Sequence, residues 1–94
     1  MIKHTVCFKI KPNGNVEKAA EILRSMEGKV PTILKLEVGV DFLKSERSYD
    51  IILQVTLKDK KALEDYQNDE YHCSVVKKYM HAVRESSIAV DCEI

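Results

Sequence analysis

Hydrophobic and polar side chains alternate along four stretches of the chain. The first stretch, residues 2–10, places five side chains on one face, a histidine among them: Ile2, His4, Val6, Phe8 and Ile10. The same alternation recurs over residues 32–41, 51–57 and 86–94. A period of two residues is typical of a β-strand with one buried face. The pattern therefore predicts four strands.

Two segments between these strands carry hydrophobic residues at helical spacing instead. The first begins after the turn at residues 12–14, with Asn15 as its N-cap, and ends at Gly28. Its inward face is expected to hold Val16, Ala19, Ala20, Leu23 and Met26. The second begins at the N-cap Asp59, and the polar run 67–70 divides it into two parts. The inward face of the first part is expected to hold Ala62, Leu63 and Tyr66. The inward face of the second part is expected to hold His72, Val76, Tyr79 and Val83.

The order strand, helix, strand, strand, helix, strand is the split βαβ arrangement of a ferredoxin-like domain. Right-handed crossovers place both helices on the same face of the four-stranded antiparallel sheet, which leaves the other face open. The side chains expected on that open face are more apolar than those of a solvated sheet: Thr5, Cys7, Ile33, Ile52 and Thr56. We therefore expect an α+β fold in which a second copy of the chain covers the open face.

Composition and charge limit the classes of function. The 94 residues suffice for one domain with a modest core, so we expect a single domain over residues 1–94. Fifteen Lys and Arg balance fifteen Asp and Glu, and this balance lacks the basic excess of a nucleic-acid-binding protein. No apolar run is long enough for a membrane span or a signal peptide, and the three cysteines form no CxxC pair. The expected location is the cytoplasm, with reduced cysteines.

The chain has no phosphate-binding glycine loop, zinc-ligand spacing or nucleophile elbow, so candidate chemistry rests on single polar residues. His4 lies among hydrophobic residues and is either a hydrogen-bonded core histidine or a pocket residue. His72 begins an inward stripe near a helix N-terminus, where the helix dipole favours a neutral, basic imidazole. Tyr66 lies on the inward face of its helix and either packs with its hydroxyl at the surface or binds a buried partner or ligand. His81 lies off the stripe and is expected to point to solvent.

Several of these residues belong to a pattern that extends over almost the whole chain. Its elements are His4, the Leu-Glu-Val-Gly of residues 36–39, the Leu-Glu-Asp-Tyr of residues 63–66, His72 and the Val-Asp of residues 90–91. The pattern resembles the stress-responsive A/B barrel (Dabb) family. The resemblance implies two ferredoxin-like subunits packed sheet against sheet as a dimeric α+β barrel, each with a small cavity between its sheet and its helices. Plant polyketide cyclases of this family use a tyrosine and a histidine in an aldol condensation, and these positions match Tyr66 and His72.

The resemblance also implies a role for each residue of the site. His72 would be the catalytic base that removes a proton next to a carbonyl group, and Tyr66 would hydrogen-bond the enolate oxygen. His4 would line the cavity and bind substrate, and Asp91 would orient His72 as part of the substrate-binding set. The remaining substrate-binding wall is expected to be apolar: Val6, Phe8 and Leu53.

The last predicted strand can face either way. Alternation alone buries Ile88 and Val90 beneath the helices, whereas the family pattern turns Ser87, Ala89 and Asp91 inward. A shift of one residue exchanges the two faces of a strand. We adopt the inward orientation of Asp91, because Ile88 and Val90 would then be buried in the dimer interface.

Two functions follow as hypotheses. The first is a homodimer that binds a small, partly apolar carbonyl compound and transfers a proton as a cyclase or an isomerase does, with no cofactor assigned and no metal ligand identified. The alternative is a non-enzymatic stress-response or ligand-binding module in which the same residues form a satisfied hydrogen-bond network. Cofactor-free oxygenation and haem chemistry occur on other dimeric barrels of this fold, but no haem ligand is indicated here. Two departures from the cyclases bear on the substrate: Ile51 replaces a further histidine, and Asp69-Glu70-Tyr71 replaces a His-Pro-x segment.

Overall fold

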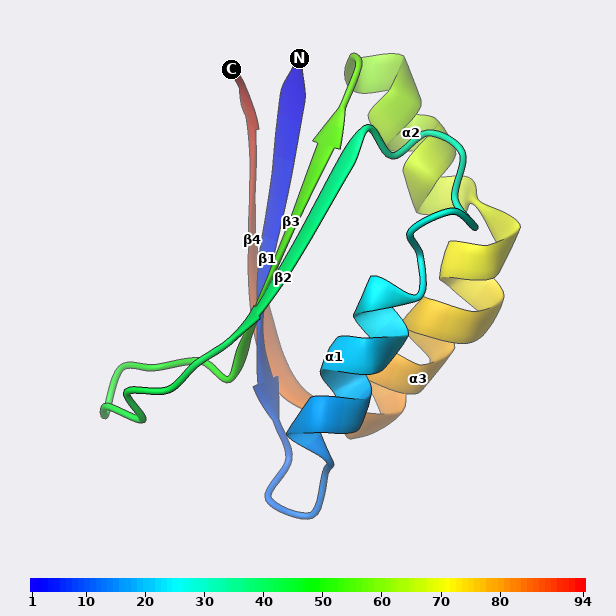
Figure 1. Cartoon of the computed structure of the whole chain (residues 1–94). Helices are drawn as coiled ribbons and strands as arrows, with labels where there is room; N and C mark the ends of the chain where they lie inside the picture. Colours follow the sequence, from blue (N-terminus) through cyan, green and yellow to red (C-terminus); the bar gives the residue numbers. More distant parts are fainter.

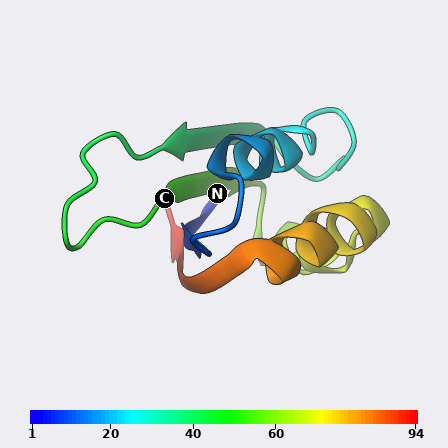
Figure 2. The ribbon, with the colours of Figure 1, turned by 90° about the horizontal axis from the view of Figure 1, so that it is seen from below.

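A four-stranded antiparallel sheet carries all of the helices on one of its faces (Figure 1, Figure 2). The computed structural model describes residues 1–94. Its elements in chain order are β1 (Ile2–Ile10), α1 (Val16–Arg24), β2 (Lys35–Val40), β3 (Ile51–Leu57), α2 (Lys60–Asn68), η1 (His72–Lys77), α3 (Lys78–Val83) and β4 (Arg84–Glu93). The segment η1 is a π-helix that continues into α3. The predicted ferredoxin-like order of strands and helices is confirmed.

β1 lies in the interior of the sheet, between β3 and β4, in the strand order β2-β3-β1-β4. His4 of β1 is paired with Val55 of β3 and with Asp91 of β4. Residues paired across antiparallel strands project from the same face, so Asp91 shares the helix-covered face with His4. The inward orientation of Asp91 is thus confirmed. Ile88 and Val90 project from the opposite face, where they are 51% and 61% exposed.

Side-chain caps begin both predicted helices where the sequence places them. The Asn15 side-chain oxygen accepts a hydrogen bond from the backbone N–H of Lys18 at 3.0 Å and caps α1. The Asp59 carboxylate accepts from the backbone N–H of Ala62 at 2.8 Å and caps α2. Each cap satisfies a backbone donor that has no partner within the helix.

Element boundaries differ most from the prediction at the end of α1 and the beginning of β2, and β4 begins at Arg84, two residues earlier than predicted. α1 ends at Arg24, and the chain reaches Gly28 through turns in which Gly28 has a φ of +80°, a conformation that glycine adopts at little cost. Met26 is nevertheless buried, so the hydrophobic pattern continues into these turns. β2 begins at Lys35, later than predicted, and Ile33 packs against the core instead of lying on the open face.

The predicted stripe of the last helix is most deeply buried at its beginning, where η1 has a wider turn than an α-helix. In a π-helix the hydrogen bonds join residues five apart, so successive side chains rotate by a smaller angle. The fully buried residues of this segment are therefore spaced by four: His72, Val76 and Met80. Tyr79 and Val83, which are predicted on that face, are half-buried and pack against the core, and the Lys18 ammonium lies 5.6 Å from the Tyr79 ring centroid. The predicted burial of His72 and Val76 is confirmed.

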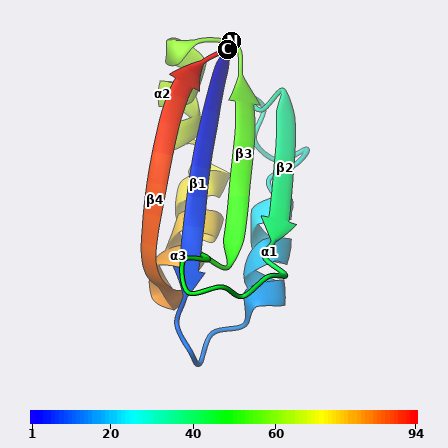
Figure 3. The ribbon, with the colours of Figure 1, turned by 90° about the vertical axis from the view of Figure 1, so that its left-hand side faces the viewer.

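Fifteen buried hydrophobic residues form one core between the helices and the sheet. The other face of the sheet has no helix on it, and all four strands are visible from that side (Figure 3). Its centre is apolar, because Ile52, Cys7 and Ile88 lie side by side on β3, β1 and β4. All three cysteines are unpaired, as predicted. None of the helices has the length and hydrophobicity required to cross a membrane.

Candidate functional site

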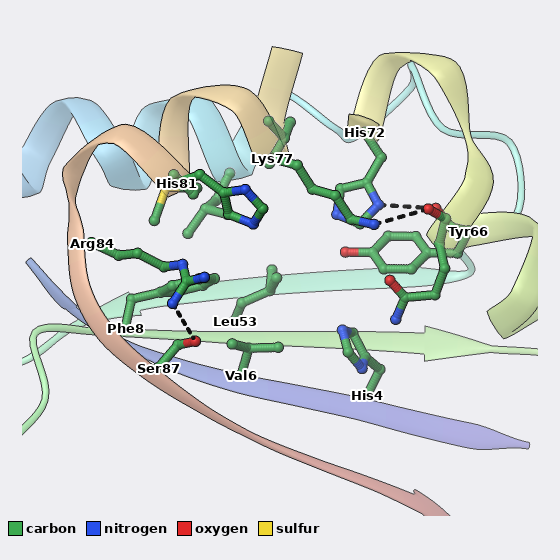
Figure 4. A pocket seen from close by; sticks show the side chains of 14 residues that line it. His4, Val6, Phe8, Leu53, Tyr66, His72, Lys77, His81, Arg84 and Ser87 are labelled. Carbon is green, nitrogen blue, oxygen red and sulfur yellow. Dashed lines mark hydrogen bonds between the residues drawn. The ribbon is translucent and has the colours of Figure 1, made fainter. Parts of the chain in front are cut away.

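A cavity of about 170 Å³ lies between the helix-covered face of the sheet and the helices η1 and α3 (Figure 4). Seven of its fourteen lining residues are hydrophobic, and all three histidines of the chain are among the others. The lining residues are His4, Val6, Phe8, Leu23, Leu53, Tyr66, Gln67, His72, Val76, Lys77, Met80, His81, Arg84 and Ser87. A cavity of about 150 Å³ accommodates benzene, so this one has room for a small organic molecule of about one ring.

His72 lies at the beginning of a helical segment whose first turn is capped by Asp69. The Asp69 carboxylate accepts a hydrogen bond from the His72 backbone N–H at 3.0 Å. The His72 Nδ1 atom is 2.9 Å from the backbone carbonyl oxygen of Tyr66. A carbonyl oxygen only accepts, so in the neutral ring Nδ1 carries the proton and donates it. The lone pair is then on Nε2, which has no hydrogen-bond partner in the chain.

The protein holds His72 in its neutral form. Burial lowers the pKa of His72 below its ordinary value of 6.5 and outweighs the opposing hydrogen bond to the Tyr66 carbonyl. The ammonium group of Lys77 lowers this pKa further, and its Nζ atom donates to the backbone carbonyl of Gln67 at 3.1 Å. A neutral imidazole with a free Nε2 accepts a proton near neutral pH. His72 therefore has the protonation state that a general base requires.

The Tyr66 ring packs against both inner histidines of the cavity. Its centroid is 4.2 Å from that of His72, in a stacked arrangement, and 5.4 Å from that of His4, in an edge-to-face arrangement. The side chain is fully buried, and its hydroxyl donates to the Met26 sulfur at 3.8 Å. Burial raises the pKa of Tyr66, and two nearby carboxylates raise it further, so the hydroxyl stays protonated. A thioether is a weak acceptor, which a ligand oxygen can replace.

His4 reaches the cavity from β1, and a carboxylate holds its ring. The Nδ1 atom of His4 is hydrogen-bonded to the Asp91 carboxylate on the neighbouring strand β4. The expected role of Asp91 in orienting His72 is therefore wrong: Asp91 orients His4. The strand register explains this difference, because it pairs Asp91 with His4, whereas His72 lies on η1 and is oriented by a backbone carbonyl. The Asp91 side chain is 43% exposed and lies behind His4, outside the cavity wall.

The structure brings the other predicted site residues together around this cavity. They are His4, Val6, Phe8, Leu53, Tyr66 and His72. Tyr66 does not reach solvent, so the interpretation of it as a tyrosine with a surface hydroxyl is wrong. His4 is hydrogen-bonded and also lines the cavity, so both interpretations of this residue are correct.

Five polar residues of the cavity are absent from the sequence-based prediction, namely Gln67, Ser87 and three residues with basic side chains. His81 and Arg84 lie at the end of the cavity away from the Tyr66 side chain, whereas the Lys77 side chain extends toward His72 (Figure 4). His81 is exposed as predicted, but its ring lies at the rim of the cavity. The spacing of the three basic residues, four and then three positions, is that of one face of a helix, but a row of basic residues with that spacing is usually solvated and does not by itself indicate a cavity.

We expect the free energy of unfolding to decrease as the pH falls below 6.5, in part because of His72. Its pKa is lower in the folded chain than in the unfolded chain, so the unfolded chain takes up a proton first and is stabilised by it. This contribution is fully present above the unfolded pKa and is lost as the pH falls below it. Denaturant unfolding at about pH 5 and about pH 8 measures the effect.

The variant His72→Asn is the control for this pH dependence, because it has no imidazole to titrate. It should lose less stability on acidification than the wild-type protein. An equal loss in both proteins would contradict the prediction, as would an NMR titration midpoint of His72 at or above the ordinary value of 6.5.

Comparison with known proteins places the chain in a family. It matches the family model Dabb, described as the Stress responsive A/B Barrel Domain, over residues 2–94, whereas no curated protein matches it. A dimeric protein of unknown function and ferredoxin-like fold from Bacteroides fragilis superposes with a TM-score of 0.84 at 23% identity, over 99% of this chain and 95% of that chain. A Dabb family protein from Mesorhizobium loti gives 0.75 at 18% identity over 99% and 95% of the two chains. A hydroxynitrile lyase from Passiflora edulis gives 0.83 at 11% identity over 99% and 92%. Because the family model spans nearly the whole chain, this protein belongs to the stress-responsive A/B barrel (Dabb) family.

Proposed function

We propose that this protein transfers a proton at the carbon next to a carbonyl group of a small substrate, in a cyclase- or isomerase-type reaction. The observation that supports the proposal most directly is the environment of the His72 ring. Its Nδ1 atom is bound to the Tyr66 carbonyl at 2.9 Å, so its basic Nε2 atom is left for chemistry. The Tyr66 phenol, which stays protonated, is stacked on the same ring. A base and a hydrogen-bond donor side by side are the two groups that enolate formation requires.

In the proposed reaction, Nε2 of His72 removes the proton from the carbon next to the carbonyl. The electron pair of the broken C–H bond forms the C=C bond of an enolate, and the negative charge moves to the carbonyl oxygen. The Tyr66 hydroxyl, released from the Met26 sulfur, donates a hydrogen bond to that oxygen. An isomerase returns the proton from His72 to a different carbon. In an aldol cyclase the enolate carbon attacks a second carbonyl carbon, and His72 returns the proton to the new alkoxide.

His4 acts in this proposal as a positioning residue. Its ring contacts the Tyr66 ring edge-to-face, and the Asp91 carboxylate fixes its orientation. The three rings also exclude water, since His4 and His72 are each 6% exposed and Tyr66 is 0% exposed. A hydrogen bond to a developing charge is stronger in such a site than in solvent.

A second function, a non-enzymatic ligand-binding or stress-response module, is favoured by one observation. The Tyr66 hydroxyl is fully buried and already has a partner in Met26. In this alternative the three rings are a satisfied packing network, and the cavity binds a ligand without changing it. Only the enzyme accelerates proton transfer, so a measurement of that step separates the two functions. The cytoplasmic location stays a prediction in either case.

We also propose that the protein is a homodimer formed through the open face of the sheet. Ile88 and Val90 are 51% and 61% exposed on that face, and Ile52 of β3, on the other side of Cys7, is 38% exposed. The loop between β2 and β3 projects from the same side (Figure 1) and carries Phe42, which is 91% exposed. Contiguous apolar surface of this kind marks a protein–protein interface. The similar protein from Bacteroides fragilis is described as dimeric, which supports the same assembly here.

Exchange of substrate protons in deuterium oxide tests the proposed chemistry without knowledge of the natural substrate. We expect the purified protein to accelerate the loss of α-proton NMR signals from at least one member of a panel of small ketones and keto acids. Tyr66→Phe removes only the hydroxyl and is expected to slow this exchange about 10²-fold, because the enolate oxygen loses a hydrogen bond.

Tyr79→Phe is the matched control, since Tyr79 is half-buried beside Lys18 and does not line the cavity. It is expected to keep the wild-type exchange rate. If the wild-type protein binds carbonyl compounds but exchanges none of their α-protons, the binding module replaces the enzyme as the function.

A further inference from the structure

The end of the cavity away from Tyr66 is positively charged. Lys77, His81 and Arg84 follow one another at helical spacing through the end of η1, α3 and the beginning of β4, and all three line the cavity. Figure 4 shows the His81 ring and the Arg84 guanidinium at this end, and the Lys77 side chain extending toward His72. The proton-transfer chemistry described above uses neither His81 nor Arg84, and Lys77 enters it only through its effect on the pKa of His72.

No carboxylate balances the charges of Lys77 and Arg84 within the cavity. Its fourteen lining residues include no Asp or Glu, although fifteen acidic residues balance fifteen basic ones over the whole chain. Asp69 and Asp91, the carboxylates near the aromatic end, are hydrogen-bonded outside the cavity. The ion pairs of the chain involve neither Lys77 nor Arg84. The cavity therefore has a positive charge that a bound anion would neutralise.

The Arg84 guanidinium retains free hydrogen-bond donors. Its one hydrogen bond in the chain runs from Nη1 to the Ser87 hydroxyl at 3.4 Å. A guanidinium has five N–H donors in a planar fork that matches the two oxygens of a carboxylate. The Arg84 side chain is only partly exposed, and charge-assisted hydrogen bonds are strong in such surroundings. Arg84 and Ser87 together can therefore hold a carboxylate at this end of the cavity.

We propose that the substrate carries a carboxylate that binds Arg84, with Ser87 and His81 beside it, while its carbonyl group faces Tyr66 and His72. This inference rests on the proposed proton-transfer function. Apolar residues between the two ends would contact the part of the molecule that joins its two polar groups: Val6, Phe8 and Leu53. The cavity of about 170 Å³ limits that part to about one ring or a chain of similar size. The substrate class is therefore a small keto acid with an apolar middle.

Binding of benzoate and benzamide separates charge from shape, because the two probes share one ring and differ mainly in charge. We expect the full-length protein to bind benzoate at least about ten-fold more tightly than benzamide in NMR titrations. Arg84→Gln is expected to weaken benzoate binding about ten-fold and benzamide binding by less than about two-fold. Equal binding of the two probes by the wild-type protein, or no binding of benzoate, would overturn the inference without recourse to any variant.

Lys78→Gln is the matched control, because Lys78 adjoins Lys77 but is exposed and does not line the cavity. It removes the same charge and is expected to leave benzoate binding unchanged. An equal loss in Lys78→Gln and Arg84→Gln would reveal a general charge effect and would exclude a carboxylate site. Thermal unfolding checks the fold of Arg84→Gln. If that variant is unstable, Arg84→Lys takes its place, because it keeps the charge and removes the planar fork, with an expected loss of about three-fold for benzoate alone.

The benzoate-binding test and the α-proton exchange test address different proposals, and either one can fail while the other succeeds. Benzoate-selective binding without exchange of any α-proton would refute the proposed function and would keep the carboxylate site. Exchange of neutral ketones and keto acids at equal rates, with no preference for benzoate over benzamide, would keep the proton-transfer function and would refute the carboxylate site.

Discussion

Replacement of His72 by asparagine is expected to lower the rate of α-proton exchange about 10²- to 10⁴-fold, the usual contribution of a general base. The asparagine amide nitrogen occupies the position of the imidazole Nδ1 atom. Its N–H group therefore keeps the hydrogen bond to the Tyr66 carbonyl, which is 2.9 Å from Nδ1 in the wild-type protein. The atom that the variant lacks is Nε2. The loss of rate, measured from the remaining α-proton NMR signal in deuterium oxide, then reports the base itself.

Cys73→Ser is the matched control for this variant. Cys73 follows His72 directly, its side chain is exposed, and it does not line the cavity. Its thiol donates to the Gln67 carbonyl at 3.2 Å, a bond that serine also forms, so the variant is expected to keep the wild-type exchange rate. If His72→Asn folds and exchanges α-protons as fast as the wild-type protein, His72 is not the base, and Nε2 of His4 becomes the candidate.

The pH profile gives a second readout of the same base. Burial lowers the pKa of His72, so Nε2 keeps its lone pair at pH values where an exposed histidine is already protonated. The exchange rate of the wild-type protein is therefore expected to fall only below pH 6.5, the ordinary pKa of histidine. A rate that falls with a midpoint above this value would assign the essential proton to another group.

Alternation along the chain predicts β1 and β3 correctly, because a period of two residues reports directly which side chains share a face. It does not determine the orientation of β4, where both rows of side chains contain hydrophobic residues. Ile88 and Val90 alternate as a buried row would, yet they project away from the helices. The pairing of Asp91 with His4 across the two strands decides the orientation, and pairing between distant segments is not visible in a local pattern.

The aromatic end of the cavity follows from the sequence, whereas the cationic end does not. Each of the three aromatic residues lies in a hydrophobic row, where a polar atom requires a partner and is therefore conspicuous. Lys77, His81 and Arg84 resemble an ordinary solvated helix face, and only the path of the chain from η1 to β4 brings them over the sheet. The π-helix has no residue signature of its own, yet its wide turn places His72 and Met80 on the same buried face.

The double substitution Ile88→Asp with Val90→Asp is expected to convert the proposed dimer into a monomer of 10.8 kDa. Both side chains are exposed in the single chain, at 51% and 61%, so the change removes little packing within it. A two-fold interface contains each residue twice, which doubles the effect of each substitution. At about 1 kcal/mol for each half-buried side chain, the lost burial amounts to about 4 kcal/mol, or about a 10³-fold increase in Kd. Sedimentation velocity over a range of protein concentrations measures the change.

Val75→Asp is the control for this substitution, because Val75 lies on η1 and is 38% exposed on the helix side of the molecule. One negative charge, against two in the double variant, is thereby added to the opposite face, and the dimer is expected to remain. If the double variant remains a dimer, the open sheet face is not the interface. The contacts that orient His72 and His4 lie within one chain, so a monomeric double variant is expected to bind benzoate as the wild-type protein does. Such a result would show that the dimer covers the sheet and that each subunit holds a complete site.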